Sequence, residues 1–194
     1  MTEEVRKIFE SSGALLEGHF LLTSGRHSPI YWEKFHVLQN PFYTQKLCHL
    51  ISQHYQNQGA QVVVGPTTGG IIIAYEVARQ LGIRSLFADR GSEGREFRSG
   101  SGLDPGTKTL IVDDILTTGK SVREVIQLVE RYGGDIIGIG ALVDRSEKDL
   151  GLGRPIFSCL RSPTVTYSPD NCPLCDRGIP LTRPGGEVIQ PSQA

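Results

Sequence analysis

The sequence predicts an α/β fold, doubly wound around a mainly parallel sheet, with a small hood formed by the N-terminal residues. Three observations support this fold class. Beyond residue 60, short apolar segments alternate with segments of helical periodicity. The apolar segments VVV, LIV and IIGIGALV are continuous, which is typical of parallel strands buried on both faces. Two turns, GPTTGG and DDILTTGKS, each follow such a segment and precede a helical one, so both should lie at one edge of the sheet.

The composition favours one domain that binds a small solute. The chain has 194 residues, of which 38% are hydrophobic, so it can bury a core without disulfides. Its 20 basic and 21 acidic residues give a net charge of -1, which argues against a nucleic-acid or membrane-surface partner. The N-terminus lacks the apolar core of a signal peptide, and no apolar run approaches the roughly 18 residues of a membrane span. We therefore expect a cytoplasmic protein with a single domain over residues 1–184 and a flexible tail over residues 185–194.

The hood is expected over residues 1–38. Its first part has apolar residues at helical spacing, and two short strands around a polar turn follow. These three elements are predicted over residues 1–13, 18–22 and 28–35.

Capping and turn residues bound the alternating elements that follow. Asn40 and Pro41 supply an N-cap and a first-turn residue for a helix that Gly59 ends. Helices are predicted over residues 41–58, 71–81 and 121–132, and strands over residues 61–64, 84–88, 109–112 and 135–143.

The segment of residues 89–107 is polar, rich in glycine and without periodicity. Irregular loops of this length are uncommon in compact domains and often serve as lids. We expect a mobile loop that covers the site, because it joins strands whose ends carry the proposed chemistry. Its cationic residues are Arg90, Arg95 and Arg98.

The segment LIVDDILTTGKSV, residues 110–122, carries the strongest functional signal. It predicts a strand that ends at Val112, followed by Asp113, Asp114 and the start of a helix. Hydroxyl side chains around Gly119 suit a phosphate, since the unpaired N–H groups and the dipole of a helix N-terminus favour an anion. The two carboxylates would repel a bare polyphosphate, but they accept hydrogen bonds from vicinal ribose hydroxyls or from water on Mg²⁺. The combination predicts a site for a phosphorylated sugar.

The same residues suggest a P-loop NTPase as an alternative. Gly119-Lys120-Ser121 matches the end of G-x-x-x-x-G-K-[ST]. The first glycine of that motif would fall at Asp114, where a carboxylate would face the phosphates. A purely structural interpretation, with a strand end and a helix cap, explains each feature singly but not their combination.

VDDILTTGKSV resembles the ribose-phosphate signature of the type I phosphoribosyltransferases, which use 5-phosphoribosyl 1-diphosphate (PRPP). Three other segments within residues 14–147 are similar to the orotate-specific branch of that family: ALLEGHFLLTSGRHSPIYWEK of the hood, GPTTGGI of the pyrophosphate loop, and LVDRSE. The CPLCDRGIPL segment resembles a bacterial branch of the family. The resemblance implies transfer of the phosphoribosyl group from PRPP to orotate in pyrimidine biosynthesis, with Mg²⁺ as cofactor, by a homodimer.

The resemblance also implies roles for individual residues. Asp113 and Asp114 would fix the ribose, and Arg95 of the loop would act with them in catalysis. Arg145 and Thr117 would bind orotate, and Tyr31 of the hood is expected to line the base pocket. The residues expected to bind PRPP are Asp113, Asp114, Ile115, Leu116, Thr117, Thr118, Gly119, Lys120, Ser121, Thr68, Gly69 and Arg90.

Two other functions stay open. One is a phosphoribosyltransferase for a different base, since the PRPP turn is shared across the family. The other is a non-catalytic regulator that binds PRPP or a nucleotide, against which the lack of a basic face or a helix-turn-helix pattern counts.

No residues are predicted as metal ligands. Cys159, Cys172 and Cys175 fall late in the chain, and the single CxxC has no second CxxC or HxxxH to complete a zinc site. The histidines lack metal-ligand spacing as well, and His27 is the one expected nearest the substrate. We therefore expect a reduced CPLC turn, with structural zinc as the alternative.

Overall fold

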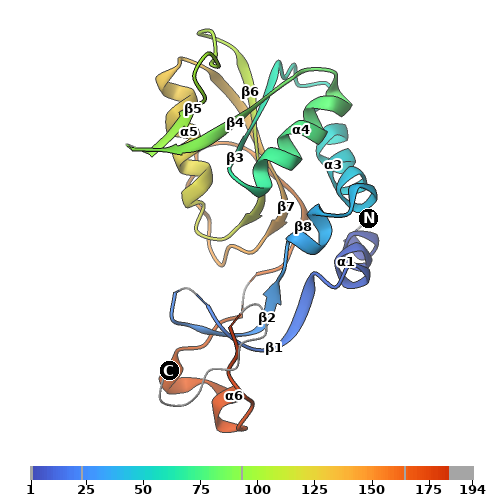
Figure 1. Cartoon of the computed structure of the whole chain (residues 1–194), viewed down its shortest axis with the longest axis vertical. Coiled ribbons are helices and arrows are strands. Elements are labelled where there is room, and N and C mark those ends of the chain that lie inside the picture. Colours follow the sequence, from blue (N-terminus) through green and yellow to red (C-terminus); the bar gives the residue numbers. More distant parts are fainter. Residues whose placement is uncertain (1, 23, 93, 164, 184–194) are drawn as a thin grey trace.

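A twisted six-stranded sheet forms the centre of the protein, in the order β5-β4-β3-β6-β7-β8 (Figure 1). The computed structural model describes residues 2–22, 24–92, 94–163 and 165–183, so the expected tail over residues 185–194 lies outside the described residues. Neighbouring strands of this sheet are parallel, except that β5 is antiparallel to β4. The strands are β3 (Val62–Pro66), β4 (Arg84–Gly91), β5 (Gly94–Phe97), β6 (Lys108–Leu116), β7 (Asp135–Asp144) and β8 (Ile156–Arg161).

Helices cover both faces of the sheet. The helices α3 (Pro41–Tyr55) and α4 (Gly69–Leu81) pack on one face, and α5 (Lys120–Arg131) packs on the other (Figure 1). Successive residues of a strand point to opposite faces, so Val63 contributes to the core under α3 and α4 while Val64 contributes to the core under α5. The prediction of a doubly wound, mainly parallel sheet is confirmed.

The start of α3 shows how local sequence sets an element. The Asn40 side chain accepts hydrogen bonds from the backbone N–H groups of Phe42 and Tyr43, and Pro41 occupies the first turn. These contacts satisfy N–H groups that have no partner within the helix. The predicted N-cap is confirmed.

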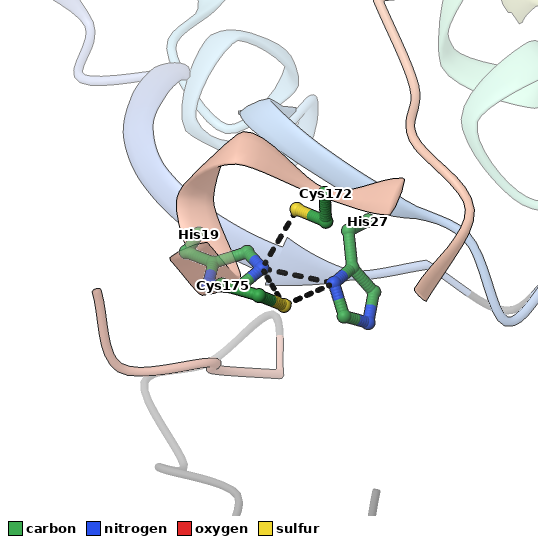
Figure 2. A group of neighbouring side chains, drawn as sticks. All are labelled: His19, His27, Cys172 and Cys175. Carbon is green, nitrogen blue, oxygen red and sulfur yellow. Dashed lines mark hydrogen bonds between the residues drawn. The ribbon is translucent and has the colours of Figure 1, made fainter. Parts of the chain in front are cut away.

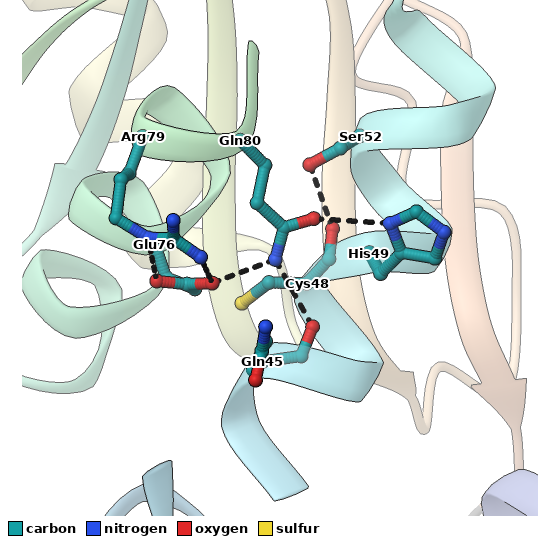
Figure 3. A network of polar contacts seen from close by, with 7 residues as sticks. All are labelled: Gln45, Cys48, His49, Ser52, Glu76, Arg79 and Gln80. Atoms are coloured by element: carbon teal, nitrogen blue, oxygen red, sulfur yellow. Dashed lines mark hydrogen bonds and ion pairs between the residues drawn. The ribbon is translucent and has the colours of Figure 1, made fainter. Parts of the chain in front are cut away.

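A polar network joins α3 to α4 (Figure 3). Gln80 of α4 donates its Nε2 to the carbonyl oxygen of Gln45 at 3.1 Å, and its Oε1 lies 3.2 Å from His49 Nδ1. Glu76 accepts from Gln80 at 2.7 Å and forms an ion pair with Arg79 at 2.8 Å. Exposed pairs of this kind contribute at most about 1 kcal/mol each, so the apolar core beneath them remains the main attachment.

The expectation of one irregular loop over residues 89–107 is wrong in its first half. The strand β4 continues to Gly91 and forms a hairpin with β5, in which Arg90 pairs with Arg95. Phe97 and Leu103 are buried in the core beneath α5. A strand of four residues is too short for its alternating burial to stand out among glycines, which is why the sequence pattern hid it. The mobility of this segment stays a prediction.

The strand before the central turn is also longer than expected. We expected it to end at Val112, but β6 includes Asp113 and Asp114 and pairs with β7 as far as Leu116. Backbone pairing continues through the two acids because it depends on main-chain groups, whereas the sequence pattern changes with the side chains. The strand β8 and the short helix α2 (Phe35–Leu38) were not expected either.

The hood is built from both ends of the chain. Its ribbon pairs β1 (Leu15–Leu21) with β2 (His27–Trp32) in antiparallel fashion, and α1 (Thr2–Ser11) packs back onto the main core. The C-terminal segment runs along the ribbon, with bridges from His27 to Tyr167 and from Phe20 to Thr182. In Figure 1 this segment, with α6 (Pro173–Asp176), lies beside β1 and β2 below the central sheet. The predicted hood of residues 1–38 is therefore incomplete.

No helix among the described residues combines the length and the hydropathy that a membrane span needs.

Candidate functional site

The two turns predicted from the sequence meet where the chain order of the sheet reverses. The strands β3 and β6 are neighbours, yet β3 leads through α4 to β4 on one side and β6 leads through α5 to β7 on the other. The two following helices leave on opposite faces, which opens a crevice at the carboxyl ends of these strands. Open α/β sheets bind their ligands at such a switch point.

Asp113 and Asp114 are the buried acids of this crevice, with 5% and 4% of their surface exposed. Asp113 accepts a hydrogen bond from Ser121 Oγ at 2.6 Å and another from the Asp114 N–H at 2.8 Å. Asp114 accepts from the Ile115 N–H at 2.7 Å, and its second oxygen pairs with Lys34 Nζ, also at 2.7 Å. Burial raises the pKa of Asp113 from 3.8 to about 6, and the neighbouring charge of Asp114 adds to the rise. Hydrogen bonds thus hold both acids in place, and the Asp113 carboxyl loses its proton closer to neutral pH than a free carboxyl does.

Lys34 is a residue of the site that the sequence reasoning missed. It follows the hood ribbon and reaches across to Asp114 with a side chain that is 36% exposed. Lys34 belongs to the hood segment that resembles the family, but no spacing rule connects it to an acid so distant in the chain. Its positive charge also lowers the pKa of Asp113, against the effect of burial.

Replacing Lys34 with methionine should lower the catalytic rate at this site by about tenfold at pH 8 and by more at pH 6. The cation that favours the charged form of Asp113 is lost, so the pKa of Asp113 rises further and less of its carboxylate is ionised at the lower pH. Initial rates at the two pH values measure this. Lys108→Met is the matched control, because Lys108 lies at the opposite end of β6. An equal loss at both pH values would contradict the electrostatic role of Lys34.

The GPTTGG turn brings backbone directly against these acids. A Cβ added to Gly69 would lie 1.8 Å from Asp114 Oδ2, and one added to Gly65 would lie 2.1 Å from the carbonyl oxygen of Gly70. Glycine is therefore required here by the close approach of the two turns. Thr68 is exposed at the start of α4, beside the buried Gly69. The structure thus brings Thr68 and Gly69 next to Asp114, as expected.

The start of α5 presents a mixture of exposed and buried groups. Thr117, Thr118 and Lys120 are exposed, and Gly119 adopts a left-handed φ of 71° as the N-cap. Leu116 is buried in the core, so its side chain faces away from the crevice, and any contact from it would involve its backbone. Ser121 is tied to Asp113, and Ile115 is half-buried.

A cavity of about 820 Å³ opens beside this turn. It is lined by Thr117 and Thr118, by Tyr31 from the hood ribbon and by Arg145 after β7. Burial lowers the pKa of Arg145 and raises the pKa of Tyr31, so at neutral pH the pair presents one cation and one neutral phenol. The three residues expected to bind the base thus lie in one cavity. The sequence reasoning missed the hood and C-terminal residues that also line it, which are Leu21, Leu22, Ser24, Arg26, Thr166 and Arg183.

Arg95 does not extend from a free loop as expected. It is buried in the β4–β5 hairpin, where its Nη1 donates to Thr67 Oγ1 at 2.8 Å and its Nε pairs with Glu124 at 3.1 Å. The guanidinium therefore braces the GPTTGG turn against α5. Its expected catalytic role stays a prediction. Arg90 and Arg98 are exposed.

Replacing Arg95 with alanine should destabilise the protein by about 1–3 kcal/mol, because Thr67 and Glu124 lose a buried partner. Urea unfolding measures this. Arg98 is exposed and directly follows β5, so the free energy of unfolding of Arg98→Ala should stay within about 0.5 kcal/mol of that of the parent protein. An Arg95 variant as stable as the Arg98 variant would rule out the bracing role.

Comparisons with known proteins identify the family. A model of the phosphoribosyl transferase domain matches residues 36–164. The orotate phosphoribosyltransferase of Desulforamulus reducens is 50% identical to this chain, and that of Pelotomaculum thermopropionicum is 46% identical; each match covers 96% of this chain and 98% of the relative. The fold is similar to the crystal structure of orotate phosphoribosyltransferase from Aeropyrum pernix, with a TM-score of 0.71 at 24% identity over 81% of this chain and 93% of that one. The chain belongs to the phosphoribosyltransferase family and, within it, to the orotate phosphoribosyltransferases.

Proposed function

We infer that the protein transfers the 5-phosphoribosyl group of PRPP to orotate, giving orotidine 5'-phosphate and pyrophosphate in pyrimidine biosynthesis. The observation that carries this inference is the arrangement of two buried acids, a glycine-lined turn and a helix N-terminus at one switch point, beside a cavity that contains Arg145. The similarity to orotate phosphoribosyltransferases over nearly the whole chain supports the choice of base.

We propose that Asp113 and Asp114 accept hydrogen bonds from the ribose hydroxyls, while the start of α5 binds the 5-phosphate. Thr117 and Thr118 are exposed there, and backbone N–H groups of a first helical turn suit a phosphate. Fixed acceptors on the sugar hold C1 in line between its leaving group and the incoming base. Such positioning supplies much of the rate in reactions without a covalent nucleophile.

The leaving pyrophosphate is proposed to lie against the GPTTGG turn, where Thr68 is exposed and Gly69 lets the turn approach Asp114 closely. Mg²⁺ prefers oxygen ligands and retains water, and the carboxylates beside this turn fit that preference, so Asp113 and Asp114 would hold it through water. When bound, Mg²⁺ would neutralise charge on the pyrophosphate. Arg90 is an exposed cation of the adjoining hairpin and is proposed to contact the same group.

The orotate is proposed to occupy the cavity between the hood and β7. A guanidinium binds a carboxylate through two parallel hydrogen bonds, and Arg145 is placed to do this with the orotate carboxylate. Tyr31 and Thr117 would orient the ring so that N1 faces C1. The N1–C1 bond then forms as the bond from C1 to the pyrophosphate oxygen breaks, and the proton of N1 passes to water or to the leaving pyrophosphate. The positive charge that develops on the ribose lies near the two acids.

An assay of PRPP consumption with orotate, uracil, hypoxanthine and adenine in parallel tests the activity, with and without Mg²⁺. We expect turnover with orotate and dependence on Mg²⁺. Turnover with a purine but not with orotate would assign a different base. Absence of turnover with every base would favour a regulator that binds PRPP.

Activity and stability should respond to pH in opposite directions through Asp113. Its pKa is raised from 3.8 to about 6, so below pH 6 the carboxyl is protonated and kcat/KM for PRPP should fall by up to about tenfold per pH unit. In the same window the folded state binds a proton that the unfolded chain does not, so this residue's contribution to stability decreases as pH rises from 4 to 6. Rate profiles and urea unfolding measure the two effects. Asp113→Asn isolates the residue, and an unchanged pH dependence of stability in that variant would contradict the assignment.

We propose that the protein acts as a homodimer in the cytoplasm. The adjoining helices α2, α3 and α4 carry large exposed apolar side chains, namely Phe35, Phe42, Ile72 and Tyr75, and a partner subunit would cover them. The cysteines of the described residues are free thiols, as is usual in the reducing cytoplasm. Light scattering during size exclusion measures the oligomeric state.

A further inference from the structure

Four side chains with metal-binding atoms lie together between the hood ribbon and the C-terminal segment (Figure 2). They are His19 of β1, His27 at the start of β2, and Cys172 and Cys175 at the turn that forms α6. One ligand atom from each lies within 4.8 Å of all the others. The expectation that the CPLC motif lacks partner ligands is therefore wrong: two histidines from the other end of the chain supply them.

The spacing of these atoms matches a tetrahedral metal site. His19 Nε2 lies 2.9 Å from His27 Nδ1, 3.6 Å from Cys172 Sγ and 3.8 Å from Cys175 Sγ, and Cys175 Sγ lies 3.4 Å from His27 Nδ1. Zinc bonds of about 2.0–2.3 Å in a tetrahedron place neighbouring ligand atoms roughly 3.3–3.8 Å apart. Separations among the four atoms extend to 4.8 Å, so an opening of a few tenths of an ångström between the imidazoles and a closure of up to about 1 Å at the widest pair would bring the group to zinc-binding distances.

The hydrogen bond of His19 orients its ring as a metal ligand. Its Nδ1 lies 2.8 Å from the carbonyl oxygen of Ile179, and a carbonyl can only accept, so Nδ1 carries the proton. In the neutral ring Nε2 then presents its lone pair to the cysteines. Histidine ligands of zinc are commonly oriented in this way by a carbonyl on the second ring nitrogen. His19, His27 and Cys172 are buried, whereas Cys175 is exposed and leaves a path by which a metal can enter.

We propose that His19, His27, Cys172 and Cys175 bind a structural Zn²⁺ ion that fastens the C-terminal segment to the hood. All four positions of the tetrahedron are filled by the protein, which is the pattern of a structural rather than a catalytic zinc site. The donor set of two thiolates and two imidazoles is one that zinc prefers. Binding removes the thiol protons, and the metal's charge stabilises the two thiolates.

The hood needs such a fastening because it contains little apolar core of its own. Its buried apolar side chains next to the cluster are Phe20, Leu174 and Leu181. The C-terminal segment is further attached to the ribbon by short backbone bridges at Tyr167 and Thr182 and by a few side-chain hydrogen bonds, such as those of Arg26 and Ser28. Small units with this little buried surface commonly depend on a metal or on disulfides.

The proposed zinc site also supports one wall of the base cavity. Arg26 precedes His27 and lines the cavity, and Thr166 and Arg183 line it from the C-terminal segment. Arg26 Nε donates to Thr166 Oγ1 at 2.7 Å, which links the two parts of this wall. Loss of the metal should therefore affect the binding of orotate more than the binding of PRPP, whose proposed site lies on the main sheet.

Metal analysis of the purified full-length protein tests the proposal directly. We expect about one zinc per chain in the parent protein and less than about 0.1 in Cys175→Ser. Cys175 is exposed, so the serine should leave the main domain folded, which circular dichroism checks. Cys159→Ser is the matched control: Cys159 donates to the Leu47 carbonyl oxygen in the main core, a hydrogen bond that serine can retain. This variant should keep its zinc.

Cobalt gives a second, spectroscopic measurement. Adding Co²⁺ to protein stripped of zinc should produce the visible bands of a tetrahedral site and a thiolate charge-transfer band, both absent from Cys175→Ser. Cys175→Ser should raise KM for orotate about tenfold and change KM for PRPP less than twofold. Parent protein that neither contains zinc nor gives these cobalt bands would overturn the proposal, as would a disulfide between Cys172 and Cys175 in the freshly purified enzyme. Zinc retained by Cys175→Ser would overturn the ligand assignment.

Discussion

Asp114→Asn will lower kcat by at least about a hundredfold and leave the fold intact. Asparagine has the same size, so the backbone contacts of this turn can persist. Its amide, however, lacks the charge that pairs with Lys34 at 2.7 Å and that would stabilise a positive ribose. Removing the charge of Asp114 also removes one cause of the raised pKa of Asp113, so the acid limb of the rate profile should shift to lower pH. Steady-state rates across pH measure both effects.

Asp135→Asn is the matched control for this variant, because Asp135 lies at the amino end of the neighbouring strand β7, away from the crevice. It should retain nearly the parent rate. Urea unfolding should show that Asp114→Asn loses at most about 1 kcal/mol of stability relative to the parent protein. Loss of the ion pair with Lys34 is offset by relief of the repulsion with Asp113. If Asp114→Asn turned over at nearly the parent rate, Asp114 would have no role in the proposed reaction.

Gly69→Ala will reduce activity by about a hundredfold and lower stability, although alanine is the better helix former by about 1 kcal/mol. The added Cβ would lie 1.8 Å from Asp114 Oδ2, a distance that no pair of non-bonded atoms tolerates, so the start of α4 or the acid must move. Either movement disturbs the meeting of the two turns. Small displacements in such a site are costly because the reacting atoms must stay aligned.

Thermal unfolding and initial rates measure the effect of Gly69→Ala. Arg79→Ala, in the last turn of the same helix and with a side chain that is 52% exposed, should change both quantities little. An active, stabilised Gly69 variant would mean that helix propensity outweighs the contact, and that the two turns are less tightly apposed than the structure indicates.

Local signals in the sequence were sufficient where a feature depends on neighbours in the chain. The N-cap at Asn40 and the apolar strand before Asp113 follow from residues within a few positions, and the structure contains both. The hairpin of β4 and β5 was missed because its burial does not depend on chain neighbours: Arg95 and Phe97 are buried by contacts with other elements, which leave no local pattern.

The central turn predicted a phosphorylated sugar by itself, because the residues proposed to recognise phosphate and ribose, from Asp113 to Ser121, are neighbours in the chain. The tertiary structure decided which distant groups complete the site: Lys34 on Asp114, Arg95 on Thr67, and Arg145 beside Tyr31. It likewise brought His19 and His27 to the cysteines of the C-terminal segment. Side chains that interact only after the chain has folded leave no periodicity or spacing by which a single sequence reveals their contact.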